Sequence, residues 1–86
     1  MIGGQETKMQ AVLYSKENCQ ECERAKMLLN SVDIPYLEYR HKKHFTDQQF
    51  YAEFGQNAMF PQVAIDYKHI GGLKETLQYL KEQNII

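Results

Sequence analysis

The amino-acid sequence predicts a single α/β domain in which a four-stranded mixed sheet is flanked by three helices, in the order β-α-β-α-β-β-α. Two observations predict this fold class. Strand-like and helix-like apolar patterns alternate along the chain, and a helix between the first two strands implies parallel pairing while a later hairpin implies antiparallel pairing. The length of 86 residues fits one domain. We expect residues 9–86 to form that domain and residues 1–8 to form a flexible tail.

The first strand and the first helix follow each other directly. Residues 10–14 are a nearly continuous apolar run, which suits a strand covered on both faces. Apolar residues then recur at spacings of three and four, the pattern of one helix face. They are Cys22, Ala25, Leu28, Leu29 and Val32. Pro35 cannot continue the helix, and residues 36–40 alternate in polarity like a half-exposed strand.

The second helix has clear start signals. Thr46 can cap it and Gln49 completes a capping box, while Phe45 and Phe50 form the flanking hydrophobic staple. Gly55 supplies a left-handed end. We expect the apolar side chains of this helix to belong to the core; they are Phe50, Tyr51 and Phe54.

The C-terminal third predicts a hairpin and a last helix. Residues 60–66 form a strand entered through Pro61, residues 67–68 turn the chain, and residues 69–70 return it. The pair Gly71-Gly72 breaks the strand. A final amphipathic helix follows, with its core face made of Leu73, Leu77 and Leu80.

Composition excludes several classes of partner. Ten basic and eleven acidic residues give a net charge of −1, so no nucleic-acid partner is expected. The run Arg40-His41-Lys42-Lys43-His44 is expected to be a solvated loop. No apolar stretch approaches membrane-spanning length, and the first residues lack a signal-peptide pattern. We therefore expect a cytoplasmic protein, in which a close cysteine pair is more often catalytic or metal-binding than structural.

The two cysteines, Cys19 and Cys22, admit three interpretations: half of a metal site, a structural disulfide, or a redox pair. A disulfide across a two-residue gap closes too small a loop to stabilise a fold much. Zinc ligation with His41 and His44 would leave eighteen residues between the cysteine pair and the histidine pair, and two residues between the histidines. Zinc-finger sites have about twelve to fifteen residues between the pairs and three to five between the histidines. The redox pair is favoured.

The position of each cysteine suggests its role. Cys19 falls where the first helix begins, and the unpaired N–H groups and dipole of a helix start favour a thiolate there. Lys16 adds a nearby positive charge, whereas Glu17, Glu21 and Glu23 oppose the thiolate. Each exposed charge contributes about 0.5 kcal/mol or less, so the backbone amides should dominate. Cys22 lies on the inward helix face and should act second.

Three motifs in the same order resemble the glutaredoxin family of thioredoxin-like proteins. They are Tyr14-Ser15-Lys16-Glu17-Asn18-Cys19-Gln20-Glu21-Cys22, Phe60-Pro61-Gln62-Val63 and His69-Ile70-Gly71-Gly72. The likeness covers residues 9–84 and is nearest to small bacterial and viral dithiol members. It implies the glutaredoxin fold and a glutathione-dependent thiol–disulfide oxidoreductase that reduces protein disulfides and glutathione mixed disulfides.

The resemblance also implies roles for individual residues. Cys19 would be the nucleophile and Cys22 the resolving thiol, with no metal ligand. Pro61 would be cis and face the cysteines. The residues implied to bind glutathione are Tyr14, Lys16, Phe60, Pro61, Gly71, Gly72 and Glu75. Glutathione would be a co-substrate, with no tightly bound cofactor. The expected partners are glutathione and disulfide-bonded or glutathionylated proteins, such as ribonucleotide reductase, and the chain is expected to be a monomer.

Two positions depart from the family pattern. Gln20-Glu21 stands between the cysteines where members usually have Pro-Tyr, and Lys74 stands where an aspartate would hold the ammonium group of glutathione. Two alternatives remain open. One is a thioredoxin-like electron donor recycled by a flavoprotein reductase, although the chain contains no tryptophan and lacks the Trp-Cys-Gly-Pro-Cys run. The other is a non-enzymatic module in which Cys19 holds zinc or a bridging iron–sulfur cluster.

Overall fold

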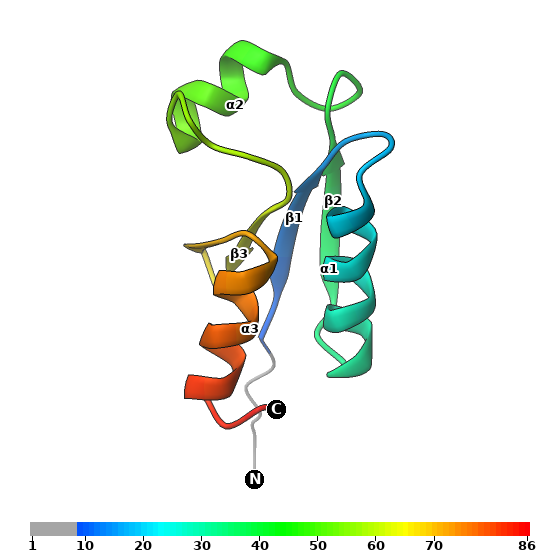
Figure 1. Cartoon of the computed structure of the whole chain (residues 1–86), viewed down its shortest axis with the longest axis vertical. Coiled ribbons are helices and arrows are strands. Elements are labelled where there is room, and N and C mark those ends of the chain that lie inside the picture. The colour runs from blue at the N-terminus through cyan, green and yellow to red at the C-terminus, as the bar shows by residue number, and fades with distance from the viewer. Residues whose placement is uncertain (1–8) are drawn as a thin grey trace, which may run out of the picture.

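The computed structural model describes residues 9–86 and confirms the predicted order of elements. The tail expected at residues 1–8 lies outside the described residues. The elements are β1 (Ala11–Ser15), α1 (Gln20–Ser31), β2 (Tyr36–Arg40), α2 (Asp47–Phe54), β3 (Gln62–Ile65), β4 (Lys68–Gly71) and α3 (Leu73–Glu82) (Figure 1).

The four strands form one mixed sheet in the order β2-β1-β3-β4. β1 pairs in parallel with β2, with Leu13 opposite Glu38. β1 pairs antiparallel with β3, where Leu13 lies opposite Val63, and β3 pairs antiparallel with β4. The crossover helix and the hairpin therefore give the two pairing directions that the sequence predicts.

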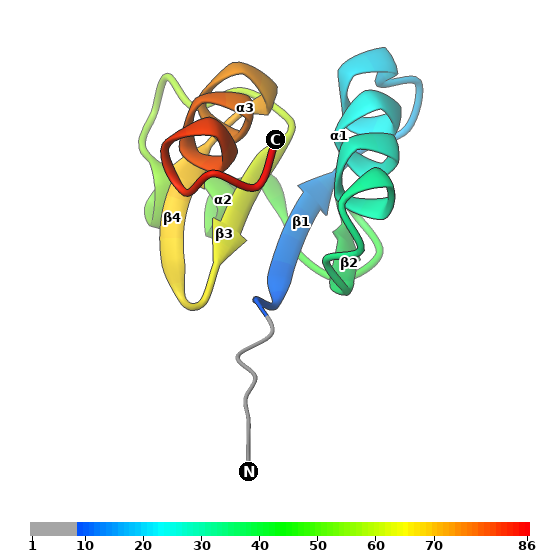
Figure 2. The ribbon, with the colours of Figure 1, turned by 90° about the horizontal axis from the view of Figure 1, so that it is seen from below.

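The three helices are distributed unequally around the sheet. α1 and α3 lie together on one face (Figure 2), and α2 lies past the end at which β1 and β2 finish (Figure 1). The shape is accordingly elongated, with principal extents of 44 × 21 × 19 Å. Both α1 and α3 begin at the end of the sheet nearest α2 (Figure 1), so the cysteine motif and the glycine pair lie at the same end of the sheet.

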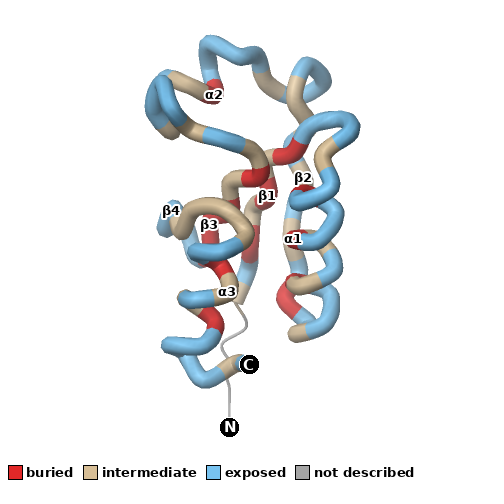
Figure 3. The backbone as a smooth tube through the Cα atoms, in the orientation of Figure 1, coloured by how far each residue is buried: buried red, intermediate tan, exposed pale blue. Residues whose placement is uncertain are grey.

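The main core lies between the sheet and the α1–α3 layer (Figure 3). In β1 only alternate residues are buried, because α2 leaves the second face of the sheet open. The prediction that this strand is covered on both faces was therefore wrong: Val12 and Tyr14 are half-buried, and Leu37 beside Val12 is 60% exposed. The buried core residues are Ala11, Leu13, Ala25, Leu29, Ile34, Val63, Ile65 and Leu80.

A second apolar centre connects α2 to the segment before β3. Phe50 is 2% exposed, and its ring stacks on that of Phe60 at 4.1 Å between centroids and on that of Phe45 at 5.7 Å. The stacked Phe45 and Phe50 confirm the predicted staple, and the capping box of Thr46 and Gln49 is present. The other expected core residues of α2, Tyr51 and Phe54, are only half-buried because α2 does not cover the sheet.

Three local predictions need correction. The hairpin turns at Asp66-Tyr67, one residue earlier than expected. Both residues have positive φ, 51° and 68°, as two-residue hairpin turns of the primed type require. Gly55 has a positive φ of 105°, but its ψ of 157° lies outside the left-handed helical region. Leu77 is half-buried, and the fully buried polar residue of α3 is Thr76, whose hydroxyl donates to the Gly72 carbonyl.

No helix that the structure describes within residues 9–86 combines the length and apolar character needed to cross a lipid bilayer.

Candidate active site

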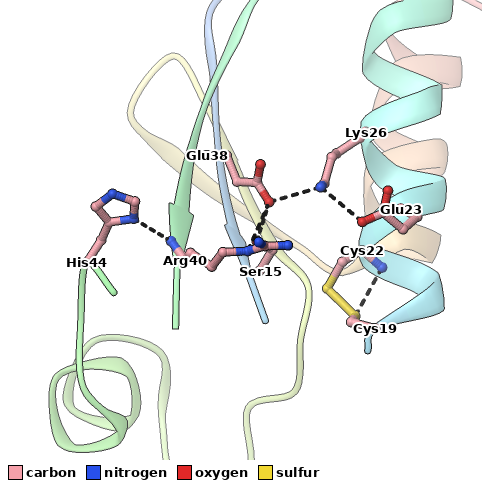
Figure 4. Close-up of polar contacts among 8 residues, drawn as sticks. All are labelled: Ser15, Cys19, Cys22, Glu23, Lys26, Glu38, Arg40 and His44. Carbon is pink, nitrogen blue, oxygen red and sulfur yellow. Dashed lines mark hydrogen bonds and ion pairs between the residues drawn. A yellow bond between two sulfur atoms is a disulfide. The ribbon is translucent and has the colours of Figure 1, made fainter. Parts of the chain in front are cut away.

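The cysteine pair sits at the start of α1 (Figure 4). Cys19 is the N-cap and is half-buried, whereas Cys22 lies on the inward face and is 1% exposed. The two form a disulfide with their Cα atoms 5.2 Å apart. The backbone N–H of Cys22 donates to the Cys19 sulfur at 3.1 Å. The sulfur thus takes the place of the side-chain oxygen that usually caps a helix.

The same N–H can stabilise negative charge on the Cys19 sulfur, because a helix start offers amide donors that have no partner within the helix. The first turn of α1 also carries Glu21 and Glu23, which are exposed. Asn18, which precedes the cap, has a positive φ of 54°, a value that asparagine tolerates better than most residues.

The segment before β3 lies beside the cysteine loop. The Phe60–Pro61 peptide bond is cis, as the resemblance implied, and Pro61 is buried. The Lys16 ammonium lies 5.5 Å from the centroid of the Phe60 ring, so the structure brings these two predicted residues together. Stacking of the same ring on Phe50 holds it in place.

The glycine pair joins β4 to α3 in a crowded position. Gly71 has a φ of 129°, and a Cβ there would lie 2.8 Å from the Cβ of Glu75. A Cβ on Gly72 would lie 3.5 Å from the Pro61 carbonyl oxygen. The Gly72 N–H donates to Oε1 of Glu75 at 3.0 Å. Glu75 therefore serves as a helix cap as well as lying near the predicted glutathione site, a role that sequence reasoning missed.

A groove of about 470 Å³ runs between the start of α1, the cis-proline segment and the start of α3. Four residues predicted from the sequence line it: Phe60, Pro61, Gly72 and Glu75. The two departures from the family pattern, Glu21 and Lys74, line it too. Further lining residues that the sequence did not indicate as site residues are Asn57, Ala58, Met59, Gln62, Leu73 and Leu77.

Tyr14 is not part of this groove. It lines a separate cavity of about 380 Å³ together with Tyr39, Glu53 and Phe54. Its ring meets that of Phe54 edge-on at 4.9 Å between centroids. Burial, followed by the negative charge of Glu53, raises the pKa of the Tyr14 hydroxyl. Tyr14, which the resemblance places among the glutathione-binding residues, thus packs against α2 and does not line the groove.

A polar network that sequence reasoning missed lies between the sheet and α1 (Figure 4). Ser15 is fully buried, and its hydroxyl donates to Oε2 of Glu38 at 2.6 Å. The Lys26 ammonium, one helical turn after Cys22, lies 3.0 Å from the same oxygen and 3.0 Å from Glu23.

Both charges of the central pair are stabilised. Burial alone would raise the pKa of Glu38, but the hydrogen bonds from Ser15 and Lys26 outweigh it and hold the pKa below its ordinary value. Burial alone would lower the pKa of Lys26, and its hydrogen bonds to Glu23 and Glu38 reverse that effect and raise it. Arg40 adds a second positive charge at 3.9 Å from Glu38.

The histidines of the zinc alternative make contacts of their own in the loop before α2. His41 pairs with Asp47 through its Nε2 atom. The Nδ1 atom of His44 accepts a hydrogen bond from the Arg40 N–H at 2.9 Å.

Comparison with known proteins gives concordant results. The family model for glutaredoxins matches residues 11–70 of the chain. Glutaredoxin 3 of Escherichia coli strain K12 is 33% identical over 60 residues, which are 70% of this chain and 72% of that protein. The structure is similar to Francisella tularensis glutaredoxin 1 complexed with cacodylate, with a TM-score of 0.69, 27% identity, and coverage of 90% of this chain and 96% of that one. It also shares the fold of buckwheat glutaredoxin in complex with glutathione, with a TM-score of 0.73, 24% identity, and coverage of 87% and 71%.

Proposed function

The chain belongs to the glutaredoxin family and is a thiol–disulfide oxidoreductase, and on that premise we propose that glutathione is its reductant and that Cys19 and Cys22 carry the reaction. The observation that carries the proposal is the contact between the Cys22 N–H and the Cys19 sulfur at the start of α1. A donor aimed at the sulfur favours the thiolate, which is the form that attacks a disulfide.

The proposed reaction begins at Cys19, the more exposed residue of the pair. The Cys19 thiolate attacks one sulfur of a substrate disulfide, the S–S bond breaks, and the other substrate sulfur leaves as a thiolate that takes up a proton. The product is a mixed disulfide between Cys19 and the substrate. Cysteines in comparable motifs have pKa values of roughly 3.5 to 7.5, so a sizeable thiolate fraction is expected near neutrality.

Cys22 completes the reduction of a protein disulfide. After losing its proton, it attacks the Cys19 sulfur, and the second substrate thiolate leaves. The enzyme is then oxidised by two electrons, in the disulfide state that the structure shows. Two glutathione molecules restore the dithiol and become glutathione disulfide. With a glutathionylated substrate, one glutathione can instead resolve the mixed disulfide at Cys19 without Cys22.

Two features of the site and one comparison support glutathione as the reductant. Lys16 lies beside Phe60, which lines the groove, and can meet a carboxylate. Pairing between β3 and β1 starts at Gln62, so the backbone N–H and C=O of Phe60 are not used by the sheet. They are available to pair with an extended peptide. The buckwheat relative with the same fold has been solved with glutathione. We further propose that the protein works in the cytoplasm on disulfide-bonded or glutathionylated proteins, ribonucleotide reductase among them.

The test is turnover of a small glutathione mixed disulfide. NADPH oxidation is followed in two coupled assays, one with glutathione and glutathione reductase and the other with thioredoxin reductase. We expect turnover in the first assay and none in the second, and we expect Cys19→Ser to abolish it. Turnover that requires thioredoxin reductase would overturn the proposal.

One observation favours the second candidate, a thioredoxin-like electron donor recycled by a flavoprotein reductase. Lys74 lines the groove where an acceptor for the glutathione ammonium group would be needed, and Oε1 of Glu75 is already bonded to Gly72. The paired assay separates the two candidates, because the donor would be reduced by thioredoxin reductase alone.

A further inference from the structure

The groove beside the cysteines carries two charged side chains of opposite sign that come from different helices. Glu21 is in the first turn of α1, between the cysteines, and Lys74 is in the first turn of α3. Both are exposed, and neither makes an ion pair with any of residues 9–86. The third charged residue of the groove, Glu75, accepts the N–H of Gly72 through its Oε1 atom, which fixes the position of its side chain. Glu21 and Lys74 are therefore the charged side chains of the groove that have no hydrogen-bond or ion-pair partner among residues 9–86.

The rest of the groove is largely apolar. Met59 is 75% exposed there, and half-buried Phe60, Leu73 and Leu77 also line it, while Asn57 and Gln62 are its uncharged polar side chains. An exposed methionine gives an adaptable apolar contact, which suits a range of protein sequences better than one small molecule. Beside it, the Phe60 N–H and C=O have no backbone hydrogen bond within residues 9–86 and can pair with an extended segment.

From these contacts, and resting on the proposed function, we propose that the groove selects protein disulfides by the order of charges around the reactive cysteine. The preferred segment is extended, with an acidic residue on the Lys74 side of the cysteine and a basic residue on the Glu21 side. The reversed order would bring like charges together on both sides. A groove of about 470 Å³ accommodates only a few residues, so these charges fall within about two or three positions of the cysteine.

The expected preference is moderate. Exposed ion pairs contribute little individually, so the two together should give about a fivefold difference in kcat/KM between the two orders. Because salt screens exposed charges, the difference should shrink as ionic strength rises to about 1 M.

The test uses two short peptides of identical composition, each carrying on its single cysteine a mixed disulfide with the small uncharged thiol 2-mercaptoethanol, so that no glutathione moiety of the substrate competes with the peptide for the groove. One has the order acid–Cys–base and the other base–Cys–acid. Wild-type protein should prefer one of them, and the charge-swapped variant Glu21→Lys/Lys74→Glu should prefer the other. This inversion does not depend on the direction in which the peptide binds.

A matched control keeps the net charge constant. The variant Lys81→Glu/Glu82→Lys exchanges two exposed charges at the far end of α3, outside the groove, and should keep the wild-type preference. Equal turnover of both peptides, or a preference that the swap leaves unchanged, would overturn the inference while leaving glutathione-dependent activity intact. Loss of turnover with a small glutathione mixed disulfide as well would instead refute the proposed function, and the inference with it.

Discussion

Replacing Ser15 with alanine tests the buried polar network most directly. The Ser15 hydroxyl is fully buried and donates to the Glu38 carboxylate at 2.6 Å. A hydrogen bond to a charged group contributes about 1.5–3 kcal/mol. Lys26 remains 3.0 Å from the same oxygen in the variant, so the carboxylate keeps part of its stabilisation. We expect Ser15→Ala to lower the free energy of unfolding by about 2 kcal/mol at pH 7.

The loss should depend on pH with a defined sign. The pKa of Glu38 is lowered in the folded protein, chiefly by the hydrogen bonds from Ser15 and Lys26 that outweigh its burial. A carboxylate of this kind makes its full contribution to the free energy of unfolding above the pKa of the unfolded state, about 4.3. The contribution is lost as the pH falls through the pKa of the folded state. The difference between wild type and Ser15→Ala should therefore be constant above about pH 5 and shrink as Glu38 becomes protonated.

The measurement is urea denaturation of both proteins, each fully oxidised, between pH 7 and pH 3. Ser31→Ala is the matched control, because the exposed Ser31 hydroxyl donates to a backbone carbonyl at 2.7 Å. This control should change stability by about 0.5 kcal/mol or less at every pH. A Ser15→Ala loss below about 0.5 kcal/mol at pH 7, or one as large at pH 3 as at pH 7, would refute the assignment.

Three further predictions concern the site and α2. Cys19→Ser should abolish turnover of every disulfide substrate, whereas Cys22→Ser should lose reduction of protein disulfides and retain deglutathionylation. The two activities are measured in separate assays, and equal losses in both variants would refute the division of roles between the cysteines. Lys74→Asp should lower the KM for glutathione by about threefold in the glutathione-coupled assay, because it adds an acceptor for the ammonium group, and an unchanged or higher KM would contradict this. Thr46→Ala should cost about 1 kcal/mol in urea denaturation, because it removes the hydroxyl that accepts the Gln49 N–H at 3.2 Å, and unchanged stability would show that the α2 cap contributes nothing.

Local signals explain which parts of the fold the sequence predicts well. The capping box of Thr46 and Gln49 involves atoms three residues apart, so it can be predicted without knowing the rest of the structure. The placement of α2 past the end of the sheet involves stacking between Phe50 in the helix and Phe60 in the segment before β3, a contact between two elements that no local pattern indicates. Periodicity alone therefore could not show that Tyr51 and Phe54 stay half-buried.

The residues of the candidate site likewise fall into those that a local sequence pattern indicates and those that only the folded structure brings together. The cysteine motif, Pro61 and the glycine pair carry local patterns, and the structure brings them to one end of the sheet. Leu77 has the helical spacing of a core residue, yet it lines the groove, because periodicity gives the face of a helix and not what lies opposite it. Glu38 sits in a strand whose alternation looks ordinary, and its partner Ser15 is 23 residues away, so nothing in the sequence indicated their contact.

At the start of α1, different groups are expected to control the reactivity of the cysteine and the recognition of the substrate. In the proposed mechanism, the reactivity of Cys19 depends on a backbone N–H fixed by the helix, which no side chain between the cysteines can remove as long as α1 forms. Glu21, an exposed residue of that same turn, can shift the thiolate only by a weak and screened interaction. The intervening positions are thus free to vary in charge with little effect on the nucleophile. Exchanging Glu21 for lysine should accordingly change which substrates bind far more than it changes the pH at which Cys19 becomes reactive, and iodoacetamide alkylation rates measured against pH can separate the two effects.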